Sequence, residues 1–154
     1  TLMTLPVNEV HVVTGKYLAS FLSTLIMISP SIFYVITTAI FGDPDVGPII
    51  GGYIGTIFLC AGFTAVGVFA SSVTKNQIIA FFTGFIICIA LTMIDTFLIF
   101  LPSNIVEFVS YISADMHFRS ITQGIIDSRD LVYFITVFAL FFTATIKVQQ
   151  NAKK

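Results

Sequence analysis

The sequence has little charge, no tryptophan and almost no cysteine, and these shortages exclude several classes of protein. Only 10% of its 154 residues are charged, whereas soluble domains average about 25%. The lysines and arginines are scattered and the net charge is -1, so no basic field for nucleic acid exists. The two cysteines, Cys60 and Cys88, form no CxxC or Cys/His spacing of a metal site. Hydrophobic residues make up 56% of the whole sequence, and 17 of them are phenylalanines.

Long apolar stretches account for most of the chain. They cover residues 17–41, 49–70, 78–101 and 131–146. A hydrocarbon core about 30 Å thick requires about 20 mostly apolar helical residues to cross it. The first three stretches meet this length and the fourth is slightly short. The sequence therefore predicts an all-α integral membrane protein, with one transmembrane domain over residues 1–154 and four spanning helices.

The first two stretches contain residues that shape membrane helices. Pro30 lies between two serines in the middle of the first stretch and predicts a kink. Either the kinked helix lines a path, or Pro30 is an ordinary proline of a membrane helix. The second stretch carries Gly51, Gly55 and Gly62, and the Gly51-x-x-x-Gly55 spacing lets two membrane helices approach closely. We expect these glycines to serve helix packing.

Residues 102–130 are more polar than the rest of the chain. Apolar residues recur there at helical spacing in two groups, namely Ile105, Phe108, Val109, Ile112 and Met116, then Phe118, Ile121 and Ile125. The pattern predicts two short amphipathic helices, too short and too polar to cross a membrane. We expect them to lie at the interface or to re-enter the membrane from the outside. Either Asp127 or Ser128 is expected to cap the last span.

Few residues are candidates for chemistry. Asp95 is the only acid within an apolar stretch, and a carboxylate at the bilayer centre costs about 2.5–3.5 kcal/mol. Asp95 has two possible roles, one in a gate or substrate path and the other in a structural hydrogen bond. His117 and Arg119 are further candidates for a gate or path. The other histidine, His11, falls on the opposite face, so no metal site is predicted. Neither GxSxG nor a phosphate loop around Gly15 is present, so we expect no catalytic or cofactor-binding residue.

The positions of lysine and arginine predict the orientation. With four spans, both chain ends share one side, which holds Lys16, Lys75, Lys147, Lys153 and Lys154. The opposite side holds Arg119 and Arg129. Because cytoplasmic loops carry the excess of positive charge, both ends are expected in the cytoplasm. The Asp43–Asp45 turn and the segment 102–130 are expected outside.

Several motifs together resemble the type-2 permeases of ABC transporters, most closely the gliding-motility branch. The resemblance rests on Thr4-Leu5-Pro6-Val7-Asn8-Glu9-Val10 leading to Gly15-Lys16-Tyr17-Leu18-Ala19, on Gly42-Asp43-Pro44-Asp45 with Gly47-Pro48-Ile49-Ile50-Gly51-Gly52-Tyr53, on Phe69-Ala70-Ser71-Ser72 with Thr74-Lys75-Asn76-Gln77, and on Asp127-Ser128-Arg129-Asp130-Leu131-Val132-Tyr133. It covers nearly the whole chain. Such permeases usually have six spans, so the four predicted here correspond to the third to the sixth, and the chain is expected to be a fragment.

The resemblance implies that the chain is a membrane-spanning permease subunit of an ABC exporter, driven by ATP hydrolysis on a separate ATPase subunit. It also implies that residues 1–9 are the end of a cytoplasmic coupling segment that docks on that ATPase. Its residues here are Leu5, Pro6, Val7, Asn8 and Glu9. ATP is bound by that partner and not by this chain, which needs no cofactor of its own. A second permease subunit, identical or different, completes the path in a bacterial-type inner (plasma) membrane.

Two alternatives to an exporter permease remain open from the sequence. In the first alternative, the chain is a membrane scaffold or assembly factor without a transport path. In the second, it is an integral membrane enzyme that uses Asp95 and the outer polar segment. Recovery of an ATPase subunit with the full-length chain would separate the permease from the scaffold, and Asp95→Asn would test the enzyme.

Overall fold

The computed structural model describes residues 9–94, 96, 110–124 and 127–152. All regular structure within these residues is helical, in the order α1 (Glu9–Ile28), η2 (Ser29–Ser31), α2 (Ile32–Phe41), α3 (Val46–Val73), α4 (Gln77–Met93), α6 (Ala114–Thr122) and α7 (Ser128–Ala152). The all-α fold class is therefore confirmed for the described residues.

Three helices are long and apolar enough to cross a membrane. They are Val10–Phe41, which joins α1, η2 and α2, then α3 and α7. The apolar helix α4 has only 17 residues, and residues 97–101 of the predicted third span lie outside the described part of the chain. These three helices indicate a multi-pass membrane protein. They do not confirm the predicted number of four spans.

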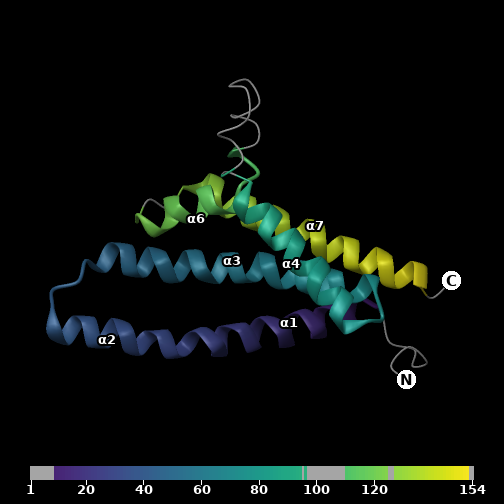
Figure 1. The fold of residues 1–154 in the computed structure, drawn as a ribbon, viewed down its shortest axis with the longest axis horizontal. Helices are drawn as coiled ribbons and strands as arrows, with labels where there is room; N and C mark the ends of the chain where they lie inside the picture. The colour runs from purple at the N-terminus through teal and green to yellow at the C-terminus, as the bar shows by residue number, and fades with distance from the viewer. Residues whose placement is uncertain (1–8, 95, 97–109, 125–126, 153–154) are drawn as a thin grey trace.

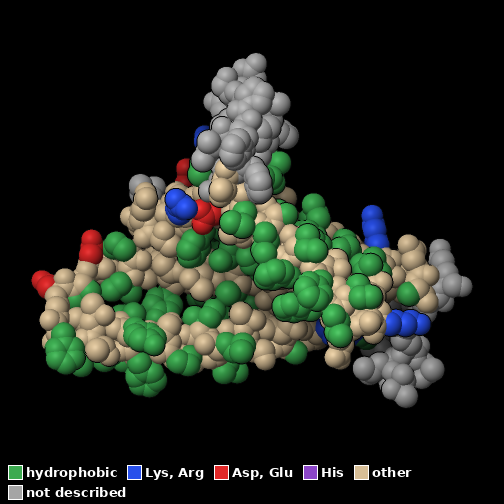
Figure 2. All heavy atoms as spheres, in the orientation of Figure 1, with side chains coloured by type: hydrophobic (Ala, Val, Ile, Leu, Met, Phe, Trp, Pro, Cys, Tyr) green, Lys and Arg blue, Asp and Glu red, His purple; other side chains and the backbone are tan. Residues whose placement is uncertain are grey.

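The helix α3 is the centre of the bundle (Figure 1). It packs against α1, α4, α6 and α7. The start of α1, the α3–α4 turn and the end of α7 lie together at the right-hand end of Figure 1, while the α2–α3 turn and α6 lie toward the other end. On the face shown in Figure 2, acidic and basic side chains gather at the two ends and beside α6, and apolar side chains cover the surface between.

Buried apolar residues lie on α1, α3 and α7 as well as on α6. Val13, Val66 and Phe134 are among them. Tyr17 of α1 donates a hydrogen bond to the carbonyl oxygen of Ala61 in α3 over 3.1 Å, and its ring lies 4.9 Å from that of Phe138 in α7. By contrast, α2 has no buried residue, which suits a helix that meets lipid or another chain.

The break predicted at Pro30 is a short 3-10 turn. Residues Ser29–Ser31 form η2 between α1 and α2, because proline cannot donate the backbone hydrogen bond of a continuous α-helix. The hydroxyls of Ser31 and Tyr53 are hydrogen-bonded at 2.9 Å. This bond ties the interruption of the first span to α3.

The helix ends differ from the predicted stretches. The helix α1 begins at Glu9 and continues through Gly15, so it starts well before residue 17. Similarly, α3 and α7 extend beyond 49–70 and 131–146 at both ends. Hydropathy detects the apolar part of a helix, whereas backbone hydrogen bonds continue into polar turns.

The second predicted amphipathic helix also has different bounds. Within residues 110–124 the helix is α6, which starts at Ala114 and therefore includes Met116. Ser113 ends the preceding turn, and its hydroxyl accepts a hydrogen bond from the Met116 amide at 3.4 Å. This cap places the boundary before Met116 rather than after it. The first predicted helix falls mostly on residues outside the described part of the chain.

Candidate functional site

The short helix α6 is docked on the first half of α3. Its Ile121 is completely buried and lies against Gly51 and Gly55 of α3. A Cβ atom at Gly51 would collide with the Ile121 carbonyl oxygen, and one at Gly55 would lie 3.3 Å from the Phe118 ring. The close approach predicted for these glycines thus involves α6 and not a second long helix.

The third glycine faces α7. A Cβ atom at Gly62 would lie 3.5 Å from Val137, an ordinary van der Waals separation. The glycine stripe of α3 therefore contacts α6 with one part and α7 with another. Only at Gly51 does the backbone of a neighbour require the absence of a side chain.

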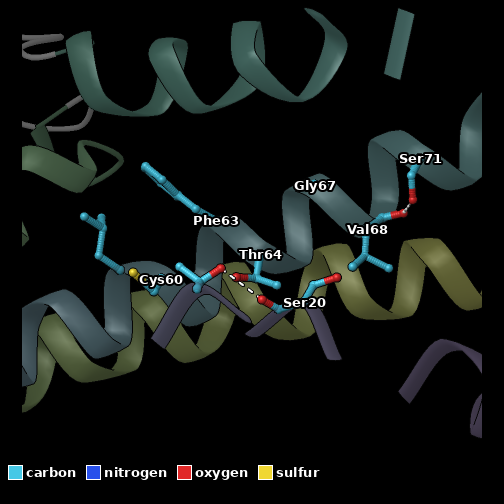
Figure 3. Close-up of a pocket in the computed structure, with 9 residues that line it drawn as sticks. Ser20, Cys60, Phe63, Thr64, Gly67, Val68 and Ser71 are labelled. Carbon is cyan, nitrogen blue, oxygen red and sulfur yellow. Dashed lines mark hydrogen bonds between the residues drawn. The ribbon is translucent and has the colours of Figure 1, made fainter. Parts of the chain in front are cut away.

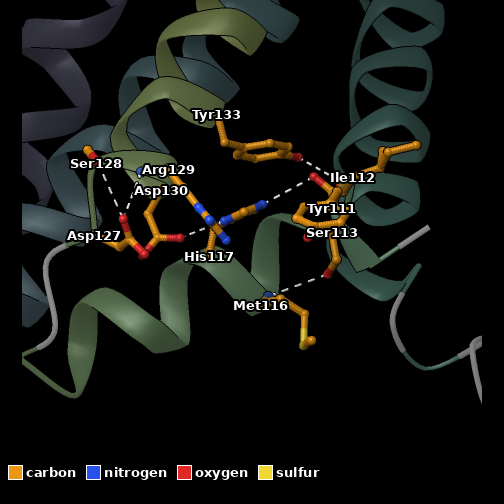
Figure 4. Close-up of polar contacts among 10 residues, drawn as sticks. All are labelled: Tyr111, Ile112, Ser113, Met116, His117, Asp127, Ser128, Arg129, Asp130 and Tyr133. Atoms are coloured by element: carbon orange, nitrogen blue, oxygen red, sulfur yellow. Dashed lines mark hydrogen bonds and ion pairs between the residues drawn. The ribbon is translucent and has the colours of Figure 1, made fainter. Parts of the chain in front are cut away.

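A polar cluster joins α6 to the first turn of α7 (Figure 4). His117 Nδ1 lies 2.7 Å from Asp130 Oδ1, and the two side chains are 13% and 7% exposed. His117 Nε2 lies 3.1 Å from the carbonyl oxygen of Tyr111. The imidazole is also stacked on the Tyr133 ring, with centroids 4.4 Å apart and planes at 22°. The contacts with Asp130 and Tyr133 tie α6 to α7, and the contact with Tyr111 links the turn before α6 to the same cluster.

The turn before α6 has a second connection to α7. The Tyr133 hydroxyl donates a hydrogen bond of 2.6 Å to the carbonyl oxygen of Ile112.

At the start of α7, Asp127 Oδ1 accepts hydrogen bonds from the Arg129 amide at 3.2 Å and from the Ser128 hydroxyl at 3.4 Å. Asp127 is therefore the cap of α7, which settles the choice between it and Ser128.

The structure separates the predicted gate candidates. His117 points to Asp130, whereas Arg119 is 69% exposed and pairs at 2.7 Å with Asp115 on its own helix. Exposed pairs of this kind contribute little stability. Asp95 lies outside the described residues, as do Leu5, Pro6, Val7 and Asn8, and α1 begins at the remaining coupling residue, Glu9.

Asp130 is a site residue that the sequence reasoning missed. The residue as a whole is 5% exposed, and its Oδ2 is a buried atom to which no described residue offers a hydrogen bond. The available signal was an acid in the first turn of a span that also carries Tyr133 at the i+3 position, on the same face of the helix. The partner, His117, lies 13 residues earlier, and only the packing of α6 brings the two together.

Both ring nitrogens of His117 are engaged by protein oxygens, namely Asp130 Oδ1 and the carbonyl oxygen of Tyr111. Among the described residues no group of three or more His, Cys, Asp or Glu side chains is placed to hold a metal ion.

A lateral groove of about 500 Å³ lies between α1 and α3 (Figure 3). Its polar lining includes Ser20, Thr24 and Ser71. The Thr24 hydroxyl donates to the Ser20 carbonyl oxygen at 2.9 Å, and the Ser71 hydroxyl donates to the Val68 carbonyl oxygen at 2.8 Å. These hydroxyl protons are used within their own helices, so the groove presents a mainly apolar surface.

A second groove opens beside the 3-10 turn. It is about 420 Å³ in volume and lies among α2, α3 and α6, with Ser31, Tyr53 and Phe118 in its wall.

Comparison with models of protein families, with curated proteins and with solved structures found no match for this chain.

Proposed function

We propose that this chain is a membrane-spanning permease subunit of an ATP-driven ABC transporter, acting as an exporter. In this proposal a separate ATPase subunit binds and hydrolyses ATP, and a second permease subunit completes the path. The chain lies in a bacterial-type plasma membrane with both ends in the cytoplasm. Besides the sequence resemblance, one structural observation carries the proposal, and two others agree with it.

That observation is the position of α6. This short helix is docked on the long apolar helices α3 and α7, at the end of α7 opposite to the terminus of the chain (Figure 1). Its buried face packs on Gly51 and Gly55, and its remaining side chains include the exposed Met116 and Arg119. A small cap before the last long helix is what the resemblance predicts for the outer face of such a permease.

The connectivity of the first span suits the coupling role proposed for residues 1–9. The helix α1 begins at Glu9, directly after the other four proposed coupling residues. A displacement of these residues by the ATPase would move α1. The Ser31–Tyr53 hydrogen bond would transmit that movement from η2 to α3. Alternating access requires such a rigid connection between the ATPase and the spanning helices.

The exposed apolar surface supports a partner within the membrane. Phe33, Ile40 and Phe41 of α2 are 72%, 71% and 86% exposed, and lipid or a second permease subunit would cover them. We further propose that α4 and the residues following it make a fourth crossing. That crossing gives both chain ends the same side, as the excess of lysine near them predicts.

Affinity purification of the full-length protein through its C-terminal tail tests the proposal. An ATPase subunit should copurify, and the complex should hydrolyse ATP in detergent. Val7→Asp should reduce copurification at least about tenfold, since a buried, unpaired charge at an interface costs more than about 1.4 kcal/mol. The matched control is Asp43→Asn in the exposed turn at the opposite end, which should leave copurification unchanged.

Two outcomes would oppose the proposal. Absence of any ATPase from a well-folded, monodisperse preparation would favour the membrane scaffold instead. Equal recovery of ATPase with Val7→Asp and Asp43→Asn would show that residues 1–9 do not form the docking site.

A further inference from the structure

The imidazole of His117 lies between two oxygen atoms that can both act as acceptors. Its Nδ1 is 2.7 Å from a carboxylate oxygen of Asp130, and its Nε2 is 3.1 Å from the backbone carbonyl oxygen of Tyr111. A carbonyl oxygen can only accept a hydrogen bond, so Nε2 must carry a proton. A neutral imidazole has one N–H group, and this contact uses it.

The contact with Asp130 then requires a second proton. If the proton is on Nδ1, an imidazolium faces a carboxylate. If it is on Asp130, a carboxylic acid donates to a neutral imidazole. Both arrangements give the pair the same number of protons, one more than a neutral imidazole beside an ionised carboxylate. The observed geometry therefore contains a bound proton, whichever residue holds it.

We propose that His117 and Asp130 form a proton-binding site that locks α6 onto the first turn of α7. Release of the proton leaves either Nδ1 facing the carboxylate or Nε2 facing the carbonyl oxygen without a hydrogen atom between them. Asp130 does not compensate through its other oxygen, because Oδ2 is buried and has no hydrogen-bond partner among the described residues. A buried polar group without a hydrogen bond is unfavourable, so proton release weakens the docking of α6.

Among the described residues, few other charged groups lie on the helices packed around this pair. On α6, Asp115 and Arg119 pair with each other at 2.7 Å. On α7, Tyr133 stacks on the imidazole, whereas Asp127 and Arg129 belong to the exposed start of the helix. The other helices packed on α6, α3 and α4, contain no Asp, Glu, Lys or Arg.

The direction of the pH effect follows from linkage. The docked contacts can form only while the pair holds its extra proton, whereas the undocked pair releases that proton as the pH rises, so low pH favours docking and rising pH opposes it. Histidine is the side chain whose charge ordinarily changes between about pH 5 and 8. The inference depends only on the contact between α6 and α7 and does not require transport, so it stands or fails separately from the proposed function.

Cysteine labelling of the purified full-length protein in detergent measures the docking. Cys60 and Cys88 are first replaced by alanine. In that background Ala114→Cys places a thiol at a position of α6 that is 1% exposed, and Met116→Cys places one on the same helix at a position that is 47% exposed. The ratio of their maleimide labelling rates removes the intrinsic pH dependence of thiol reactivity and reports the opening of α6.

We expect this ratio to rise about tenfold or more between about pH 5 and 8. Asp130→Asn supplies an N–H donor to Nδ1 of a neutral His117 while Nε2 still donates to Tyr111. It should therefore keep the ratio low and independent of pH. His117→Gln removes the titrating ring and should give a high ratio that is also independent of pH.

A flat ratio in the parent background, or a rise that persists in Asp130→Asn, would overturn the inference. Size-exclusion chromatography of each variant identifies any that has lost its fold. If His117→Gln fails this control, the parent background and Asp130→Asn together still decide the outcome, since one must respond to pH and the other must not.

Discussion

Gly51→Ala is predicted to destabilise the docking of α6, although alanine favours a helix more than glycine. The added Cβ would collide with the Ile121 carbonyl oxygen, and it would lie 3.4 Å from the backbone of Gly124. Both neighbours are backbone atoms of one tight turn, in which the Gly124 amide donates to the Ile121 carbonyl oxygen at 3.0 Å. A turn of this kind cannot rotate away as a flexible side chain can.

Two opposing terms set the size of the effect. Overpacking of a well-packed contact costs about 1–3 kcal/mol. Replacing glycine by alanine within a helix contributes about 1 kcal/mol in the favourable direction. Gly51→Ala therefore loses about 0–2 kcal/mol overall. Gly52→Ala is the matched control, because a Cβ there meets nothing within 4 Å and only the favourable term applies.

The two alanine variants should differ by about 1–3 kcal/mol, because the helix-propensity term cancels between neighbouring positions. Thermal stability in detergent, followed as the fraction of protein that stays monodisperse after heating, measures this difference. In the Ala114→Cys background, labelling of the introduced thiol should also accelerate with Gly51→Ala and not with Gly52→Ala. Equal stability and equal labelling in both variants would refute the close packing of α6 on α3.

Three further substitutions test individual contacts by the same thermal assay. Tyr133→Phe keeps the ring but loses the hydroxyl bonded to Ile112, so a loss of about 0.5–1.5 kcal/mol is expected; no loss would contradict that bond. Asp127→Ala removes the cap of α7 and should cost about 0.5–2 kcal/mol, whereas an unchanged stability would argue against capping. Arg119→Gln breaks only an exposed pair with Asp115 and should change stability by less than about 1 kcal/mol; a larger loss would indicate a role beyond that pair.

The long helices were predictable because their signal is local. An apolar stretch such as residues 49–70 reports a helix of membrane length without knowledge of its neighbours, and α3 (Val46–Val73) covers it. Helix ends are less predictable, because they depend on which side chain reaches which amide. The Thr74–Gln77 pair fits a capping box in the sequence, yet the Asn76 side chain caps α4 through the Ile78 amide at 2.9 Å.

The polar cluster could not be predicted in the same way. His117 stands among charged residues in the sequence, which is typical of a solvated surface. Its burial arises only because Ile121 and Phe118, on the apolar side of α6, pack against Gly55 of α3. That packing turns His117 toward Asp130, so the pair is a product of three helices and has no short sequence motif.

Site-directed labelling of the intact cell tests the central arrangement most directly, namely chain ends on the inside and α6 on the outside. In a background without Cys60 and Cys88, single cysteines replace Asp45, Met116 and Lys75. A membrane-impermeant maleimide should label the first two positions in intact cells, and the third only after permeabilisation. Labelling of position 75 from outside, with positions 45 and 116 protected, would contradict the arrangement.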